Sequence, residues 1–131
     1  MNKNILGNLK SKDLIIKNKS AIDFIDFIED WKWILKKEIE KNSNNNGTLV
    51  YAMWFTNCSD DFLFLFKLLI LDNYEAFTCS YNILNEQKFN ISIEDKNKSI
   101  RILKSFKEEW FSEEDYNERK RAMLSIINKI K

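Results

Sequence analysis

Hydrophobic residues are densest between Thr48 and Glu94, and their order along the chain predicts a sheet in this region. Four apolar segments follow one another here, and short polar turns separate them. Valine, tyrosine, tryptophan and phenylalanine favour extended structure, and alternation of apolar and polar residues is typical of a strand with one buried face. The predicted strands are 48–56, 62–71, 74–81 and 88–94, joined as an antiparallel meander.

The support for these strands differs from one to the next. In the last one, Phe89, Ile91 and Ile93 alternate with polar residues, as in a half-buried strand. By contrast, 62–71 is an apolar run broken only by Lys67, which fits either a buried strand or a buried helix. Its short length and the Asp-Asn turn that follows it favour a central strand covered on both faces.

Helical periodicity appears on both sides of the predicted sheet. One helix is expected to begin at Ser20, because apolar residues then recur along one stripe. A second follows Asp95 or Asn97, and a third follows Ser112, whose hydroxyl is expected to cap it. The predicted fold is therefore a single α+β domain with an N-terminal helix, a four-strand antiparallel β-meander and two C-terminal helices. Residues 1–12 are expected to be loosely ordered.

Composition narrows the chemistry that the chain can support. The 131 residues include no histidine, two glycines and two cysteines. These counts exclude imidazole-based catalysis and zinc binding, a tetrathiolate metal site and glycine-rich phosphate loops. No cofactor and no metal site is therefore predicted. Cys58 and Cys79 could pair, but free thiols in a reducing compartment are the expectation for a chain without a secretory signal.

The charge distribution bears on partners and location. Residues 57–95 carry two basic and seven acidic groups, for −5, and residues 96–131 carry ten and six, for +4. The net charge of the chain is +1, so it lacks the basic excess of a nucleic-acid-binding protein. The N-terminus lacks an apolar signal region, and the longest apolar run is too short to span a bilayer. A cytoplasmic protein that contacts neither membrane nor nucleic acid is predicted.

One catalytic pattern is present in the chain. Asp72, Glu86 and Lys88 have the spacing of a D…ExK nuclease site, in which two carboxylates hold a magnesium ion. The alternative members of such a site are Asp60, Asp61 and the second triplet Glu94-Asp95-Lys96. Such triplets arise by chance in a chain that is 31% charged, and turn residues around strands explain them equally well.

Two places in the sequence favour contact with a protein partner. The first is Trp33, which lies about 140° from the centre of the apolar stripe of the first helix. It falls on the polar face among Asp26, Glu29 and Asp30. A tryptophan rimmed by acidic residues is typical of an interface anchor. The competing interpretation is that Trp33 packs against the N-terminal segment or a loop.

The second place is the acidic turn 108–118, between the last two predicted helices. Trp110 and Tyr116 fit the apolar stripes of their helices and are interpreted as structural. An acidic surface that includes aromatic residues suits a partner with a basic active site, such as a nuclease. The partner-binding candidates here are Glu108, Glu109, Phe111, Glu113, Glu114, Asp115 and Glu118.

These observations favour a small non-catalytic inhibitor that binds one protein partner, a toxin, nuclease or effector. A toxin-cognate immunity protein and a phage counter-defence protein of the anti-CRISPR kind are two examples of this class. The alternatives are a metal-dependent nuclease with the D…ExK site and a structural subunit of a larger assembly. The sequence leaves the oligomeric state open.

Overall fold

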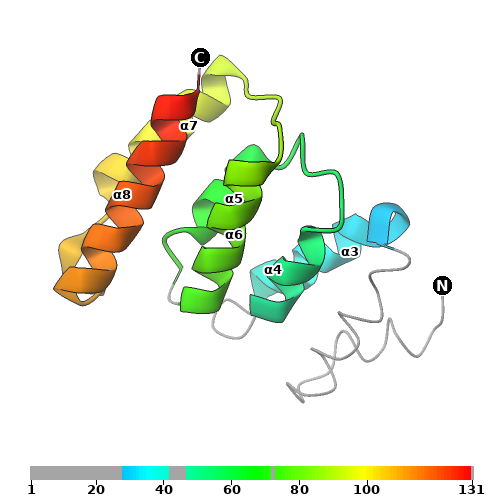
Figure 1. Ribbon diagram of the computed structural model, residues 1–131, viewed down its shortest axis with the longest axis horizontal. Helices are drawn as coiled ribbons and strands as arrows, with labels where there is room; N and C mark the ends of the chain where they lie inside the picture. The colour runs from blue at the N-terminus through cyan, green and yellow to red at the C-terminus, as the bar shows by residue number, and fades with distance from the viewer. Residues whose placement is uncertain (1–27, 42–46, 72, 131) are drawn as a thin grey trace.

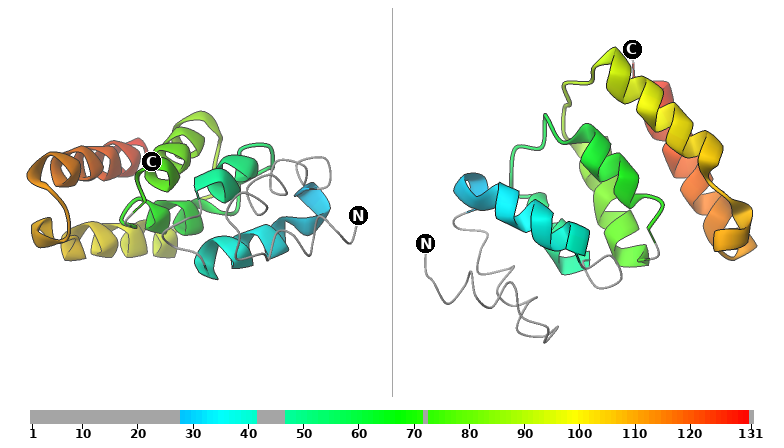
Figure 2. Two further views of the ribbon diagram at one scale, coloured as in Figure 1. Left: turned by 90° about the horizontal axis from the view of Figure 1, so that it is seen from below. Right: turned by 180° about the vertical axis from the view of Figure 1, so that it is seen from behind.

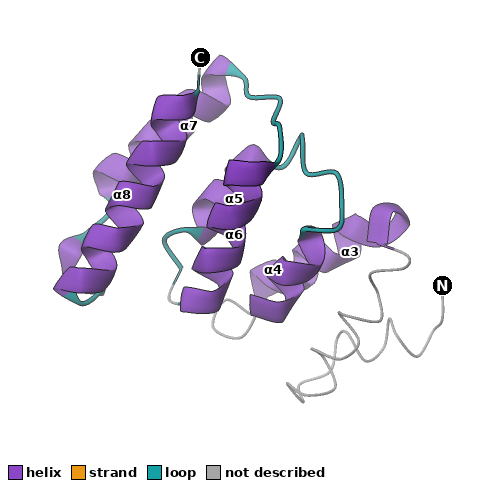
Figure 3. Cartoon of the chain, viewed as in Figure 1, coloured by secondary structure: helices purple, strands orange, loops and turns teal. Residues whose placement is uncertain are grey.

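A computed structural model describes residues 28–41, 47–71 and 73–130, and this part of the chain consists of helices and the loops that join them (Figures 1 and 3). It contains six α-helices and one short 3-10 helix. Their bounds are α3 Ile28–Lys41, α4 Gly47–Met53, α5 Phe62–Leu68, α6 Tyr74–Glu86, α7 Ile93–Ser105, η2 Glu108–Trp110 and α8 Glu113–Lys129. The prediction of an α+β fold with a four-strand meander is therefore wrong for the described residues.

The helices form three pairs that lie side by side: α3 with α4, α5 with α6, and α7 with α8 (Figure 1). Seen from below, α3, α5 and α7 make one layer and α4, α6 and α8 make the other (Figure 2). Within the second layer α6 contacts both of its neighbours, α4 and α8. The core lies between the two layers, where side chains such as Leu35, Leu49, Phe66 and Met123 are fully buried.

The pattern of buried residues explains why 74–81 is not a strand. Buried side chains of α6 recur at helical spacing through Ala76, Phe77, Ser80, Ile83 and Leu84. A strand would have turned Ser80 away from Phe77, yet both are buried. Positions four residues apart share a face in a helix and in a strand, so the short alternation in the sequence fitted both structures.

The segment 62–71, whose sequence fits either a strand or a helix, forms the helix α5 over Phe62–Leu68. Phe62, Leu65, Phe66 and Leu68 are buried in α5, at the spacing of one broad helix face. This helix packs against α6 and α7, and Lys36 of α3 lies over the ring of Phe64, so only Lys67 is exposed. Lys67 is the one polar residue of α5, so the run lacks the polar positions by which helical periodicity is normally recognised.

The first and last predicted strands are also helical or irregular. Most of 48–56 belongs to α4, and 88–94 is a loop followed by the first residues of α7. The preference of aromatic and β-branched residues for strands spans only about 1 kcal/mol, so packing of an apolar helix face overrides it.

Most of the predicted helices are confirmed where the structure describes them. The first helix is present over Ile28–Lys41, and its predicted start at Ser20 lies outside the described residues, as do residues 1–12. Ser112 caps α8 as predicted, because its hydroxyl oxygen accepts a hydrogen bond of 3.2 Å from the N–H of Asp115. The second helix begins earlier than predicted, at Ile93, with Ser92 as its cap.

An ion cluster joins α3 to α5. The carboxylate of Asp61 is only 5% exposed and accepts hydrogen bonds of 2.7 Å from both Lys32 and Lys36. Lys36 also lies 4.9 Å above the ring of Phe64. Two lysines one helical turn apart thus hold the buried carboxylate that precedes α5.

Gln87 connects the end of α6 to the loop between α4 and α5. Its side-chain oxygen accepts a hydrogen bond of 2.9 Å from the N–H of Cys58. Its side-chain nitrogen donates to the carbonyls of Trp54 and Thr56, at 3.3 and 3.1 Å. One amide side chain therefore satisfies three backbone groups of a loop that has no secondary structure of its own.

The structure also bears on the cysteines and on membrane insertion. Cys58 is buried, Cys79 is half-buried, and they do not form a disulfide. Within the described ranges, no helix combines the length and the apolar character that crossing a bilayer requires.

The close approach of α4 to α6 yields a stability prediction. A Cβ atom added at the buried Gly47 would lie 2.7 Å from the Cβ of Glu75. We expect Gly47→Ala to lower the free energy of unfolding by about 1–3 kcal/mol, because overpacking forces the two helices apart. Urea denaturation followed by circular dichroism measures this change. Thr48→Ala, one residue along the same helix, is the control and should change stability by less than about 1 kcal/mol. Equal stability of Gly47→Ala and wild type would contradict the close approach.

Candidate functional site

The helices α6 and α8 lie side by side, and a groove runs between them. Asn73 starts α6 by accepting a hydrogen bond of 3.0 Å from the N–H of Ala76. Tyr74, the first residue of α6, is 55% exposed and donates its hydroxyl proton to Glu118 of α8, with 2.7 Å between the oxygens. This hydrogen bond closes the space between the two helices at the surface.

Hollows lie on both sides of the Tyr74–Glu118 bond. The first, which we call the α6–α8 groove, has a volume of about 330 Å³. Its lining residues are Tyr74, Phe77, Thr78, Tyr81, Asn82, Glu118 and Ala122. The second, which we call the acidic hollow, has a volume of about 270 Å³. Its lining residues are Tyr74, Ser112, Glu114, Asp115 and Glu118. Both therefore share the bonded pair, and carboxylates dominate the second.

A buried arginine holds α8 in position beside this groove. Arg119 is 1% exposed, and one nitrogen of its guanidinium donates to the carbonyls of Leu69 and Leu71, at 2.8 and 2.7 Å. The guanidinium also lies 4.7 Å from the ring centroid of Phe77 and 4.5 Å from that of Phe111. It thereby ties α8 to the end of α5, to α6 and to the turn before α8.

The charge of Arg119 is balanced by Asp115, which lies one helical turn earlier in α8. Its Nε donates to Asp115 Oδ1 at 2.9 Å. A buried guanidinium is tolerated only when it is paired and hydrogen-bonded, and Asp115 supplies that pairing. Asp115 is therefore occupied by this structural contact.

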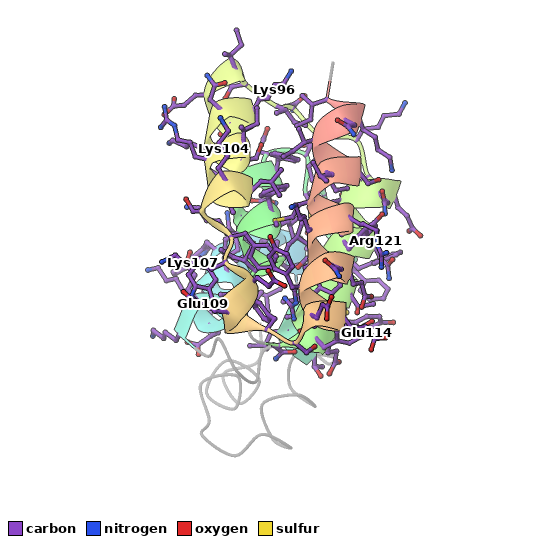
Figure 4. All side chains as sticks on the ribbon, turned by 90° about the vertical axis from the view of Figure 1, so that its left-hand side faces the viewer. Lys96, Lys104, Lys107, Glu109, Glu114 and Arg121 are labelled. Carbon is purple, nitrogen blue, oxygen red and sulfur yellow. The ribbon has the colours of Figure 1, made fainter. Side chains whose placement is uncertain are left out.

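The predicted candidates of the turn 108–118 divide between two sides of the α7–α8 hairpin. Figure 4 shows Glu109 and Glu114 at the same end of the hairpin but on opposite sides of the first turn of α8. Glu113 and Glu114 are exposed, and Glu118 joins Tyr74. Glu108 and Glu109, also exposed, line a separate hollow with Lys107.

Two of the three aromatic residues of this turn, Phe111 and Trp110, differ in how far they are buried. Phe111 faces inward, with its ring centroid 5.5 Å from that of Phe106, and it covers Arg119. Trp110, interpreted from its stripe as structural, is 50% exposed. A short 3-10 helix between α7 and α8 changes the register of the turn, so neither helical stripe extends to these positions.

The structure places the Trp33 surface elsewhere. Trp33 is 57% exposed, as its position off the apolar stripe predicts, and Lys37 lies 5.0 Å above its ring. Because α3 and α8 are at opposite ends of the row of helices, this surface is separate from the groove (Figure 1). Asp26 lies outside the described residues, and only the backbone of Glu29 and Asp30 is described.

Glu86 and Lys88 of the D…ExK pattern do not lie at the start of a strand, where the sequence predicted them. Glu86 is the last residue of α6 and Lys88 lies in the loop after it, so the triplet does not enter a strand. Asp72 lies outside the described residues. Within the part of the chain that is described, no three acidic or cysteine side chains gather where they could hold a metal ion.

Sequence reasoning missed the aromatic wall of the groove. Tyr74, Phe77 and Tyr81 are spaced i, i+3 and i+7, which is the spacing of one helix face. The spacing can be read from the sequence, but it indicates a shared face only if 74–86 is interpreted as a helix.

No protein-family model, curated protein or solved structure matches the chain. The chemistry of the site therefore has to be argued from its own residues. The carboxylates of Glu113 and Glu114 are exposed, and that of Glu118 accepts a hydrogen bond from Tyr74. Together with the aromatic rings of the groove, they form a surface that attracts cations.

The hydroxyls of the groove give a prediction about pH. The hydrogen bond to Glu118 raises the pKa of Tyr74 above its ordinary value of 10.0, and partial burial adds to this. Hydrogen bonds from Asn85 and Ser125 lower the pKa of Tyr81. An NMR titration of the tyrosine rings should therefore show Tyr81 ionising before Tyr74.

The sign of the accompanying stability change follows from the raised pKa. Because the unfolded chain releases the Tyr74 proton first, the bond stabilises the fold fully below pH 10.0 and progressively less as the pH rises through the folded pKa. Glu118→Gln should bring the pKa of Tyr74 down towards 10.0 while leaving Tyr81 unchanged. Ionisation of Tyr74 at its ordinary pH in the wild type would contradict the bond.

Proposed function

We propose that the chain is a cytoplasmic, non-catalytic inhibitor that binds one protein partner through the α6–α8 groove and the acidic hollow. The observation that carries this proposal is the Tyr74–Glu118 pair, which lies between two hollows on a surface that also exposes Glu113 and Glu114. Concave surfaces with a few convergent polar groups and exposed aromatic rings are typical binding sites.

The charges of this surface indicate the kind of partner. Three carboxylates line the acidic hollow: Asp115, which is paired with Arg119, and Glu114 and Glu118, which give the hollow its negative charge. Complementary charges steer association and exclude partners of like charge. A nuclease, toxin or nucleic-acid effector with a basic active surface fits this requirement, and an inhibitor that occupies such a surface needs no catalytic group of its own.

Capture of the partner with matched charge reversals tests this proposal. Glu114 and Glu94 are each the second residue of an exposed helix start, in α8 and α7 respectively. We expect wild type and Glu94→Lys to capture the same protein from the native host in stoichiometric amount. Glu114→Lys should weaken the interaction at least about tenfold, because like charges across an interface cost several kcal/mol. Affinity should also fall as salt is raised.

Two results would overturn this proposal. Equal capture by Glu114→Lys and wild type would exclude this surface as the contact, and absence of any stoichiometric partner would exclude the inhibitor. Trp33→Ala separates the two candidate surfaces, since Trp33 lies on α3 at the other end of the row. Capture should survive this substitution, and loss of capture in Trp33→Ala alone would move the contact to α3.

A further inference from the structure

Three aromatic rings form one wall of the α6–α8 groove. The centroids of Tyr74 and Phe77 are 5.7 Å apart, and those of Phe77 and Tyr81 are 6.3 Å apart. Phe77 is 3% exposed and forms the inner part of the wall, whereas Tyr74 is 55% exposed at its edge. Ring faces attract a cation that lies within about 6 Å of their centroids.

A single carboxylate faces this wall from α8. Among the described residues that line the groove, Glu118 alone is acidic, and one of its oxygens accepts the hydrogen bond from Tyr74. The neighbouring residues Thr78 and Asn82 add a hydroxyl and an amide to the lining. A charged group with several hydrogen-bond donors would therefore meet a carboxylate, two phenol oxygens and an amide oxygen in one recess.

The same pair of helices already holds one group of this kind. The guanidinium of Arg119 lies between the rings of Phe77 and Phe111 and is paired with the carboxylate of Asp115. Aromatic rings and a carboxylate from α8 are the elements of that internal site. The α6–α8 groove offers the same elements, with Glu118 one turn along α8 from the position of Asp115.

We propose that the α6–α8 groove receives an arginine side chain of the protein partner, which stacks on the tyrosine wall and pairs with Glu118. This inference rests on the proposed function, since it names the chemistry by which the partner is recognised. The guanidinium replaces the Tyr74 hydroxyl at Glu118, so the hydrogen bond in the unbound protein acts as an internal competitor for the site.

Arginine fits this recess better than lysine for two physical reasons. Its planar group can stack on a ring while its donors, arranged as a fork, reach a carboxylate, whereas an ammonium is a compact and strongly hydrated charge. The volume of about 330 Å³ also accommodates a side chain but not a folded element. The partner is thus expected to insert one residue here, while its other contacts lie on the rim.

A short peptide and its neutral analogue provide the first test. The probe is acetyl-Gly-Arg-Gly-amide, and the control replaces arginine by citrulline, which keeps the shape and removes the charge. We expect the arginine peptide to shift the NMR signals of the Tyr74 and Tyr81 rings with millimolar affinity, since one side chain supplies only a small part of an interface. The citrulline peptide should bind at least about tenfold more weakly.

Variants of the groove provide the second test. Glu118→Gln should weaken binding of the arginine peptide about tenfold, because the charged hydrogen bond is lost. Tyr74→Phe removes the internal competitor and should strengthen binding about threefold. Glu94→Gln, an acidic residue of α7 outside the groove, is the control and should leave the affinity unchanged.

The outcomes separate this inference from the proposed function. Equal binding of the arginine and citrulline peptides, an unchanged affinity in Glu118→Gln, or no shift of the tyrosine signals would overturn the arginine site. If the partner is nevertheless captured and lost in Glu114→Lys, the proposed function stands without this inference. Weaker binding in Tyr74→Phe would show that the phenol assists the ligand and would overturn the competition between them.

Discussion

The buried guanidinium of Arg119 is the interaction on which this arrangement of helices most depends. It is 1% exposed and joins four elements: the end of α5, the ring of Phe77 on α6, the turn at Phe111 and its own helix α8. A charge in this position stabilises the fold only while every partner is present, because an unpaired buried charge costs several kcal/mol. The contact therefore fixes the distance between the α5–α6 and α7–α8 pairs.

That distance determines the candidate site. Tyr74 and Glu118 come from different helices and meet only because α8 is held against α6. Glu118 directly precedes Arg119 in the sequence, so the buried arginine orients the neighbouring carboxylate towards the groove. The same helix thus presents one face to the core through Arg119, while Glu114 and Glu118 line the hollows of the proposed site.

The sequence predicted α3, α7 and α8, whose apolar stripes or caps can be recognised locally, and it failed on α4, α5 and α6. α8 was predicted from Ser112 and its acidic first turn, because capping and charge act locally. α5 is apolar at every position except Lys67, so its sequence shows no periodicity, and the strand that was predicted there is wrong. The candidate acids Glu113, Glu114 and Glu118 follow from composition, but their pairing with Tyr74 does not, since it depends on how α6 packs on α8. Because 74–81 was predicted to be a strand, the shared helix face of Tyr74, Phe77 and Tyr81 was not recognised from the sequence.

The most direct test of the role of Arg119 is the pKa of Tyr74 measured by NMR titration in Arg119→Lys. Lysine can pair with Asp115 but cannot stack between Phe77 and Phe111 or reach two carbonyls with a planar fork. If the guanidinium sets the spacing of α6 and α8, Tyr74 should lose its bond to Glu118 and its pKa should fall towards 10.0 while circular dichroism still reports a helical protein. A pKa that stays raised in the folded variant would contradict this account, because the groove would then form without the arginine.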